Sequence, residues 1–170
     1  MEIWYIPSLS VCSMRMFLLL VYLFLLVIPF GFATVLLSNG SGAHLSNATD
    51  QGALLGFMST ITNDPFQSLP TKWKSNVSVC EWIIIRCSGH RVVALNVLRM
   101  ILVGAISPLL GNLSLLVKLD LSHNHFHGHI PYQLGGCRSL KILNLFGKNL
   151  RENIPSELCG LSKLQYYLLR

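Results

Sequence analysis

The sequence predicts an α/β solenoid, in which similar coils stack side by side and each coil begins with a short strand. Three observations carry this prediction. Apolar residues recur with a period of 24 residues from Val92 to the end of the chain. Pro interrupts each full unit in its middle, and a segment with a Cys-Trp-Cys motif precedes the first unit. A fixed period of this length is typical of repeat architectures.

The repeat register is regular. Val92, Leu116, Leu140 and Leu164 stand 24 residues apart. Apolar residues then recur at offsets +3, +5, +10, +14, +18 and +21, which in the second unit are Leu119, Leu121, Phe126, Ile130, Leu134 and Cys137. One coil cannot bury its own apolar faces, so stacked neighbours must form a continuous core.

Each unit is expected to open with a strand, because Leu119-Asp120-Leu121 alternates inward and outward side chains. Asn124 stands where its amide can bond the backbone of the turn that leaves the strand. A long helix or coiled coil is excluded because proline falls within each unit, at Pro108, Pro131 and Pro155.

The amino terminus reads as a secretory signal over residues 1–43. Arg15 precedes an apolar stretch, Pro29 breaks it, and small residues predict cleavage after Ala33 or Ala43. An uncleaved anchor remains an alternative, since residues 16–37 carry no charge and are long enough to span a bilayer. In either case the rest of the chain enters the secretory lumen.

Glycosylation sequons agree with export. Asn-x-Ser/Thr triplets occur at Asn39, Asn47, Asn76 and Asn112, and the last three remain after either cleavage. Cys12 would leave with the signal, so that Cys80, Cys87, Cys137 and Cys159 remain.

The second unit, LVKLDLSHNHFHGHIPYQLGGCRS, resembles the plant-type extracellular leucine-rich repeat, LxxLxLxxNxLxGxIPxxLxxLxx. The resemblance implies a second strand beside the first at Gly128-x-Ile130-Pro131. Residues 44–90, with Cys80-x-Trp82-x4-Cys87, resemble the family's amino-terminal cap. Residues 92–163 would then be three full repeats, and residues 164–170 would begin a fourth.

In the cap, Asp50 is expected as the N-cap of a helix that continues through Ala53, Leu54, Phe57 and Ile61. The resemblance implies a Cys80–Cys87 disulfide. Several positions depart from the family pattern. Ile84 replaces a Gly and would be strained at positive φ, Met100 and Lys148 replace the turn Asn, and Glu152 replaces a Gly.

Strand parity predicts a concave face, the outward side of the strands, that carries the candidate ligand contacts. The candidates are Arg99, Lys118, Asp120, Ser122, His123, Asn144, Phe146 and Tyr166. Aromatic residues mixed with basic ones are typical of interface hot spots. Asp120 and Ser122 are expected to form part of a solvated surface.

Four alternating histidines, His123, His125, His127 and His129, form a weak candidate metal site. Same-face neighbours would stand about 6.5 Å apart along a strand, a poor fit to one tetrahedral ion, so the prediction is no metal. A Cys137–Cys159 bridge would need local rearrangement, because Cys137 occupies an inward position and Cys159 an outward one.

Other function classes find little support. The chain has a net charge of +6, but its Lys and Arg are scattered without a basic run, which argues against nucleic-acid binding. No phosphate-binding loop, kinase catalytic loop or His-Glu-x-x-His motif occurs. We therefore expect no catalysis and no cofactor.

The resemblance implies a ligand- or co-receptor-binding ectodomain of a plant receptor-like kinase, at the cell surface or outside the cell. Its partners would be a peptide or protein and a co-receptor, with membrane contact only through a signal, an anchor or a later span. The alternatives are a secreted inhibitor of the polygalacturonase-inhibitor kind and a truncated, non-signalling receptor product. Because the fourth coil lacks its return half, residues 44–170 alone are expected to be marginally stable.

Overall fold

The computed structural model describes residues 47–67, 69, 78–147, 149–150 and 154–168. The expected signal segment, Asn76, Lys148, Glu152 and Arg170 lie outside the described residues. In the described part, no helix is both long enough and apolar enough to cross a membrane.

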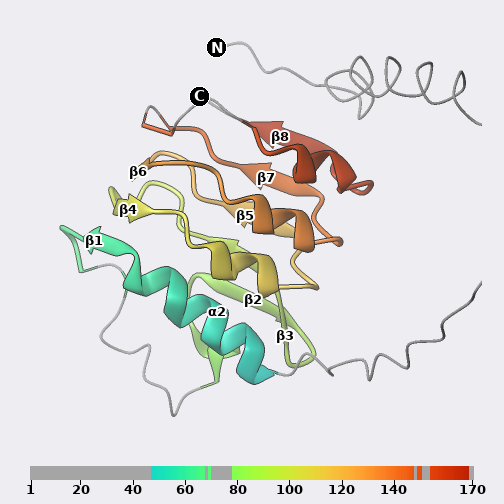
Figure 1. The fold of residues 1–170 in the computed structure, drawn as a ribbon. Helices are drawn as coiled ribbons and strands as arrows, with labels where there is room; N and C mark the ends of the chain where they lie inside the picture. Colours follow the sequence, from blue (N-terminus) through green and yellow to red (C-terminus); the bar gives the residue numbers. More distant parts are fainter. Residues whose placement is uncertain (1–46, 68, 70–77, 148, 151–153, 169–170) are drawn as a thin grey trace, which may run out of the picture. The chain divides into compact units, whose positions relative to one another are not determined.

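The described residues form an α-helix, short 3-10 turns and short strands in the order that a repeated coil requires (Figure 1). The elements are α2 (Asn47–Ser59), β1 (Ile61–Asn63), η1 (Val79–Glu81), β2 (Ile85–Ser88), β3 (Arg91–Asn96), β4 (Val103–Ala105), η2 (Pro108–Asn112), β5 (Lys118–Asp120), β6 (His125–His127), η3 (Tyr132–Gly136), β7 (Ile142–Asn144), η4 (Ser156–Gly160) and β8 (Tyr166–Leu168). The predicted solenoid with short parallel strands and a helical cap is confirmed.

Two sheets run along the solenoid. The larger has the order β2-β3-β5-β7-β8, in which β2 is antiparallel and the rest are parallel. Its outward side is the concave face. The smaller has the order β1-β4-β6 and contains the second strands implied by the Gly-x-Ile-Pro element. Gly128, which follows β6, has a φ of 86°, a conformation that favours glycine.

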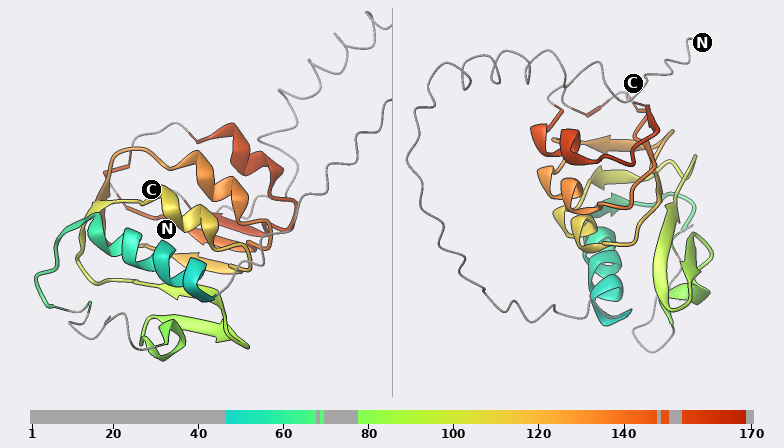
Figure 2. Two further views of the ribbon diagram at one scale, coloured as in Figure 1. Left: turned by 60° about the horizontal axis from the view of Figure 1, so that its bottom comes forward. Right: turned by 90° about the vertical axis from the view of Figure 1, so that its right-hand side faces the viewer.

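Helical elements line the side opposite the larger sheet. Figure 2 shows α2 and the turns η2, η3 and η4 stacked in one layer, with the strands in another. The turns stack closely: a Cβ on Gly135 would lie 2.8 Å from the carbonyl oxygen of Glu157. Inward side chains such as Leu95, Leu119 and Leu143 are fully buried between the layers.

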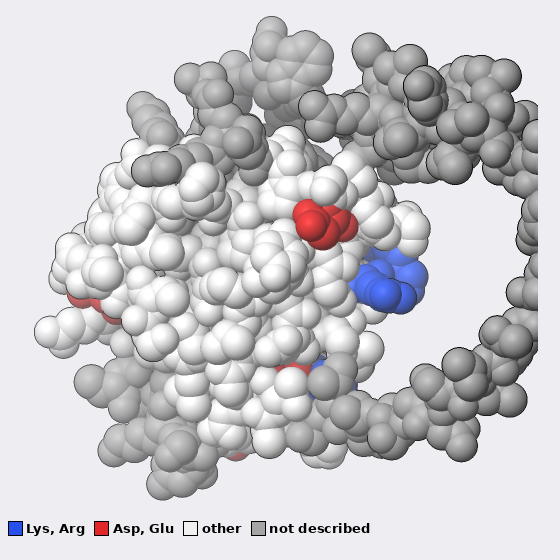
Figure 3. Space-filling model, in the orientation of Figure 1, with Lys and Arg blue, Asp and Glu red and all other residues white. Residues whose placement is uncertain are grey.

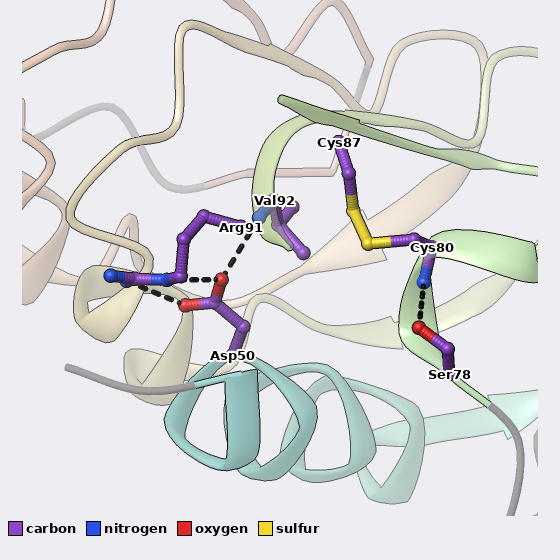
Figure 4. Close-up of a disulfide and its surroundings, with 6 residues drawn as sticks. All are labelled: Asp50, Ser78, Cys80, Cys87, Arg91 and Val92. Atoms are coloured by element: carbon purple, nitrogen blue, oxygen red, sulfur yellow. Dashed lines mark hydrogen bonds and ion pairs between the residues drawn. A yellow bond between two sulfur atoms is a disulfide. The ribbon is translucent and has the colours of Figure 1, made fainter. Parts of the chain in front are cut away.

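Asp50 joins the cap to the first coil, and a disulfide lies within the cap (Figure 4). Asp50 was expected to cap the helix, but this is wrong, because α2 begins at Asn47 and Asp50 lies in its first turn. Its carboxylate accepts instead from the Arg91 guanidinium, with both contacts at 2.9 Å, and from the Val92 amide at 2.9 Å. Charged partners from β3 outweigh a local cap bond here.

The Cys80–Cys87 disulfide is present and ties η1 to β2. Ile84, between them, was expected to be strained if it needed positive φ. Among the described residues the non-glycine positive φ values belong to Gln67, Arg99, Ile101 and His123, so Ile84 is not strained. It is buried instead, at 7% exposure.

Candidate ligand-binding surface

The concave face is built by strand register. Pairing aligns Ala94, Lys118, Ile142 and Tyr166 in one row across the sheet. A second row contains Asn96, Asp120 and Asn144. Since neighbouring strands lie about 4.8 Å apart, each row presents side chains at a spacing that an extended partner can follow.

A repeated backbone device fixes how each strand ends. The side-chain oxygens of Asn96, Asp120 and Asn144 each accept from the backbone amide two residues later, at 3.1, 3.3 and 3.2 Å. These bonds are Asx turns, which hold the chain as it leaves the sheet. Arg99 and His123 follow with φ values of 58° and 57°.

Asp120 and Ser122 were expected to be solvated, and this is wrong. They are only 6% and 1% exposed. The Ser122 hydroxyl donates to Asp120 Oδ1 at 2.6 Å and accepts from the side-chain Nδ2 of Asn144 at 3.2 Å. Lys118 Nζ lies 3.7 Å from Asp120 Oδ2. The tight packing of successive coils draws these short side chains below the surface, where they bond to one another.

Apolar side chains stand on both sides of buried Ser122. Leu98 is 42% exposed and Phe146 is 38% exposed. The Phe146 ring packs against the His123 imidazole, with ring centres 5.2 Å apart. A small pocket also opens beside Phe146, lined partly by Leu121 and Leu145. Exposed apolar groups that are held close together in turns beside a sheet are typical of binding surfaces.

Asn124 supports the turns from which these residues project. Its side-chain oxygen accepts from the amides of Met100 at 3.1 Å and Leu102 at 3.0 Å. Its amide group donates to the carbonyls of Val97, Leu121 and Ser122. Asn124 therefore also supports the turn of the preceding coil, where Met100 stands in place of the turn Asn.

The histidines do not form a compact cluster. His125 and His127 are exposed on β6 of the smaller sheet, and His129 follows them. His123 lies in the turn after β5, which belongs to the larger sheet. No group of three or more His, Cys, Asp or Glu among the described residues is placed to hold a metal ion.

Cys137 is a buried free thiol, so it forms no bridge with Cys159. Its Sγ contacts the Leu110 carbonyl at 3.3 Å. Burial raises the pKa of the Cys137 thiol to about 12, which keeps it protonated and unreactive near neutral pH.

Arg86 belongs to the same face, although sequence reasoning did not select it. It lies on β2 in register with Ala94 and is exposed. Paired residues on neighbouring strands point to the same side of a sheet. Arg86 therefore extends the first row onto the cap. The sequence contained one signal for Arg86. If the cap ends in a strand and Ile85 points inward, then the next residue, Arg86, must point outward.

Family models match two parts of the chain. Residues 47–88 match the leucine rich repeat N-terminal domain, and residues 115–137 match the Leucine Rich Repeat. The LRR receptor-like serine/threonine-protein kinase GSO2 of Arabidopsis thaliana is 37% identical over 109 residues, which is 63% of this chain and 9% of that protein.

Solved structures agree. The PEPR1–AtPEP1 structure superposes with a TM-score of 0.66 and 35% identity, covering 72% of this chain and 18% of the other. A second structure is the ectodomain of the Arabidopsis thaliana receptor kinase GASSHO1/SCHENGEN3 in complex with CASPARIAN STRIP INTEGRITY FACTOR 2. It superposes with a TM-score of 0.60 and 31% identity, and the match covers 72% of this chain and 15% of the other. The chain therefore spans less than a fifth of each of these proteins.

The period, the two sheets, the disulfide-bonded cap and these matches have one explanation: the chain contains a leucine-rich-repeat N-terminal domain followed by leucine-rich repeats, and it is similar to the amino-terminal ectodomains of plant leucine-rich-repeat receptor-like kinases.

Proposed function

We propose that this chain is part of a ligand- or co-receptor-binding ectodomain of a plant cell-surface receptor-like kinase, and that it binds protein or peptide partners on its concave face. The observation that carries the proposal is the pair of exposed apolar residues, Leu98 and Phe146, held beside a buried hydrogen-bonded network. The matched regions are a leucine-rich-repeat N-terminal domain and a leucine-rich repeat, which are not catalytic.

A rigid scaffold favours binding of this kind. The strand ends are fixed by hydrogen bonds of Asp120, Ser122 and Asn144. The protein would therefore lose little conformational entropy when a partner binds. The same fold, at 31% identity, has been solved with CASPARIAN STRIP INTEGRITY FACTOR 2 bound. This precedent supports a proteinaceous partner for the present chain.

The proposal includes the secretory pathway, with delivery to the cell surface or the extracellular space. The Cys80–Cys87 disulfide supports an oxidising compartment. Asn112 is exposed at the end of η2, where a glycan would be accommodated by solvent. We propose Asn112 as a glycosylation site, with Asn47 and Asn76 as further sites in the cap.

Photo-crosslinking tests the binding face. Phe146 is replaced in the full chain by photo-reactive p-benzoylphenylalanine, and Tyr132, 58% exposed on η3, is replaced in a matched control. Incubation with plant extracellular fluid and irradiation should give a discrete protein or peptide adduct at position 146 but not at position 132. No adduct at position 146, or equal labelling at both positions, would overturn the proposal.

A further inference from the structure

Two basic side chains flank a small one at the cap end of the concave face. Arg86 on β2 and Lys118 on β5 are the two register neighbours of Ala94 on β3. With strands about 4.8 Å apart, the Cα atoms of the two basic residues lie about 10 Å from each other. The methyl group of Ala94 leaves the space between them open to a group that both long side chains can reach.

The face has an excess of accessible positive charge. Arg86 and Arg99 are exposed, and neither forms an ion pair within the described part of the chain. Lys118 has a 39% exposed side chain and only a long contact, 3.7 Å, with Asp120.

The described concave-face positions offer one carboxylate, Asp120, and that residue is buried against Ser122. The face along α2 and η2–η4 shows few charged side chains (Figure 3). Electrostatic complementarity therefore favours an acidic partner for the concave face.

We propose that the concave face selects an acidic peptide segment, one carboxylate of which lies over Ala94 between Arg86 and Lys118. This inference rests on the proposed binding function and adds the chemistry of the partner. An apolar side chain of the same peptide packs over Ser122, between Leu98 and Phe146. A peptide satisfies both requirements, whereas an acidic polysaccharide supplies carboxylates but no apolar side chain for Leu98 and Phe146.

Fluorescence anisotropy with defined probes tests the proposal. One short labelled peptide alternates Glu with Gly around a central Leu, and a second replaces every Glu with Gln. The proteins are the full chain and its variants Arg86→Gln, Lys118→Gln and Arg138→Gln. Arg138 is an exposed cation after η3, away from the strand rows, so it controls for a general loss of positive charge. Thermal unfolding verifies that each variant is folded.

The Glu peptide should bind at least about tenfold more tightly than the Gln peptide, because each contact to a carboxylate is charge-assisted. Arg86→Gln and Lys118→Gln should each remove most of that difference without changing affinity for the Gln peptide. Arg138→Gln should change neither affinity. Added salt should weaken binding of the Glu peptide but not of the Gln peptide.

Equal affinities for the two peptides would overturn the acidic preference. It would also be overturned if Arg138→Gln weakened binding of the Glu peptide as much as Arg86→Gln and Lys118→Gln do. A polygalacturonate oligomer that displaces the Glu peptide with the same affinity would overturn the choice of a peptide. If the crosslink at position 146 still forms in either case, the proposed binding function stands and only this inference fails. If that crosslink is absent, the proposed function itself fails.

Discussion

Asp50 in the cap helix and Arg91 at the start of β3 form a bidentate ion pair, with Arg91 Nε 2.9 Å from Oδ2 and Nη2 2.9 Å from Oδ1. Asp50 is fully buried, and the same Arg91 nitrogen Nη2 also donates to the Ser114 hydroxyl at 3.2 Å. One guanidinium thus connects the cap, the first strand and the entry to the second coil. The hydrogen bond to Asp50, with its charge, raises the pKa of Arg91.

Removing the carboxylate should destabilise the whole solenoid. Asp50→Ala leaves the Arg91 side chain, only 20% exposed, without its partner and leaves the Val92 amide unbonded. We expect a loss of about 3 kcal/mol in the free energy of unfolding, measured by urea denaturation. Asp64→Ala, a carboxylate change in a half-buried loop, is the comparison and should cost less. Equal losses for the two variants would show that the ion pair does not hold the cap.

Substitution of Asn124 should destabilise the protein far more than substitution of Asn96, whose side chain forms an Asx turn in the preceding coil. Asn124→Asp replaces a donor to three carbonyls with an acceptor, so oxygen would face oxygen in a buried site. The expected cost is about 3 kcal/mol or more. Asn96→Asp keeps the single acceptor bond to the Leu98 amide and should change stability by less than about 0.5 kcal/mol. Thermal unfolding of both variants measures the contrast, and similar melting temperatures would contradict it.

Ile101 stores backbone strain. Its φ is 55°, in the left-handed region that a β-branched residue rarely adopts, and its side chain is 41% exposed. Ile101→Asn should therefore stabilise the protein by about 1 kcal/mol, since Asn tolerates this conformation and little burial is lost. Ile83→Asn is the control, because Ile83 is 91% exposed and does not have positive φ. If denaturant midpoints rise equally in both variants, relief of strain is not the cause.

Stability should fall as pH rises from about 9 towards 12. Burial raises the pKa of Cys137 from 9.0 to about 12, so in this window the unfolded chain loses a proton that the folded chain retains. Unfolding is favoured by up to about 1.4 kcal/mol per pH unit from this group. Burial also raises the pKa of Tyr167, which acts in the same direction.

The Cys137 contribution is isolated by Cys137→Ala. This variant should be less stable near neutral pH because of the cavity, and its stability should decline less steeply above pH 9. Chemical denaturation at a series of pH values provides the slopes. Parallel curves for the variant and the parent chain would exclude Cys137 as the source.

Much of the fold was predictable because the same pattern of apolar positions occurs several times along the chain. The inward Leu119 and Leu143 stand 24 residues apart and are both fully buried. Any solenoid that buries this period must align Lys118 with Ile142, and so the rows of the concave face follow from spacing alone.

The sequence by itself determined the solenoid, the strand positions and the residues that point outward. The tertiary structure decided which of those residues a partner can reach. Asp120 and Phe146 both point outward, yet only Phe146 is exposed, because the Asp120 carboxylate is hydrogen-bonded to the Ser122 hydroxyl below the surface.

Contacts between coils also placed Asp50 against Arg91, 41 residues later, and added Arg86 to the face through the pairing of β2 with β3. Local pattern specifies the direction of a side chain, but burial and ion pairing depend on neighbours far away in the chain. Those neighbours come together only when the coils stack.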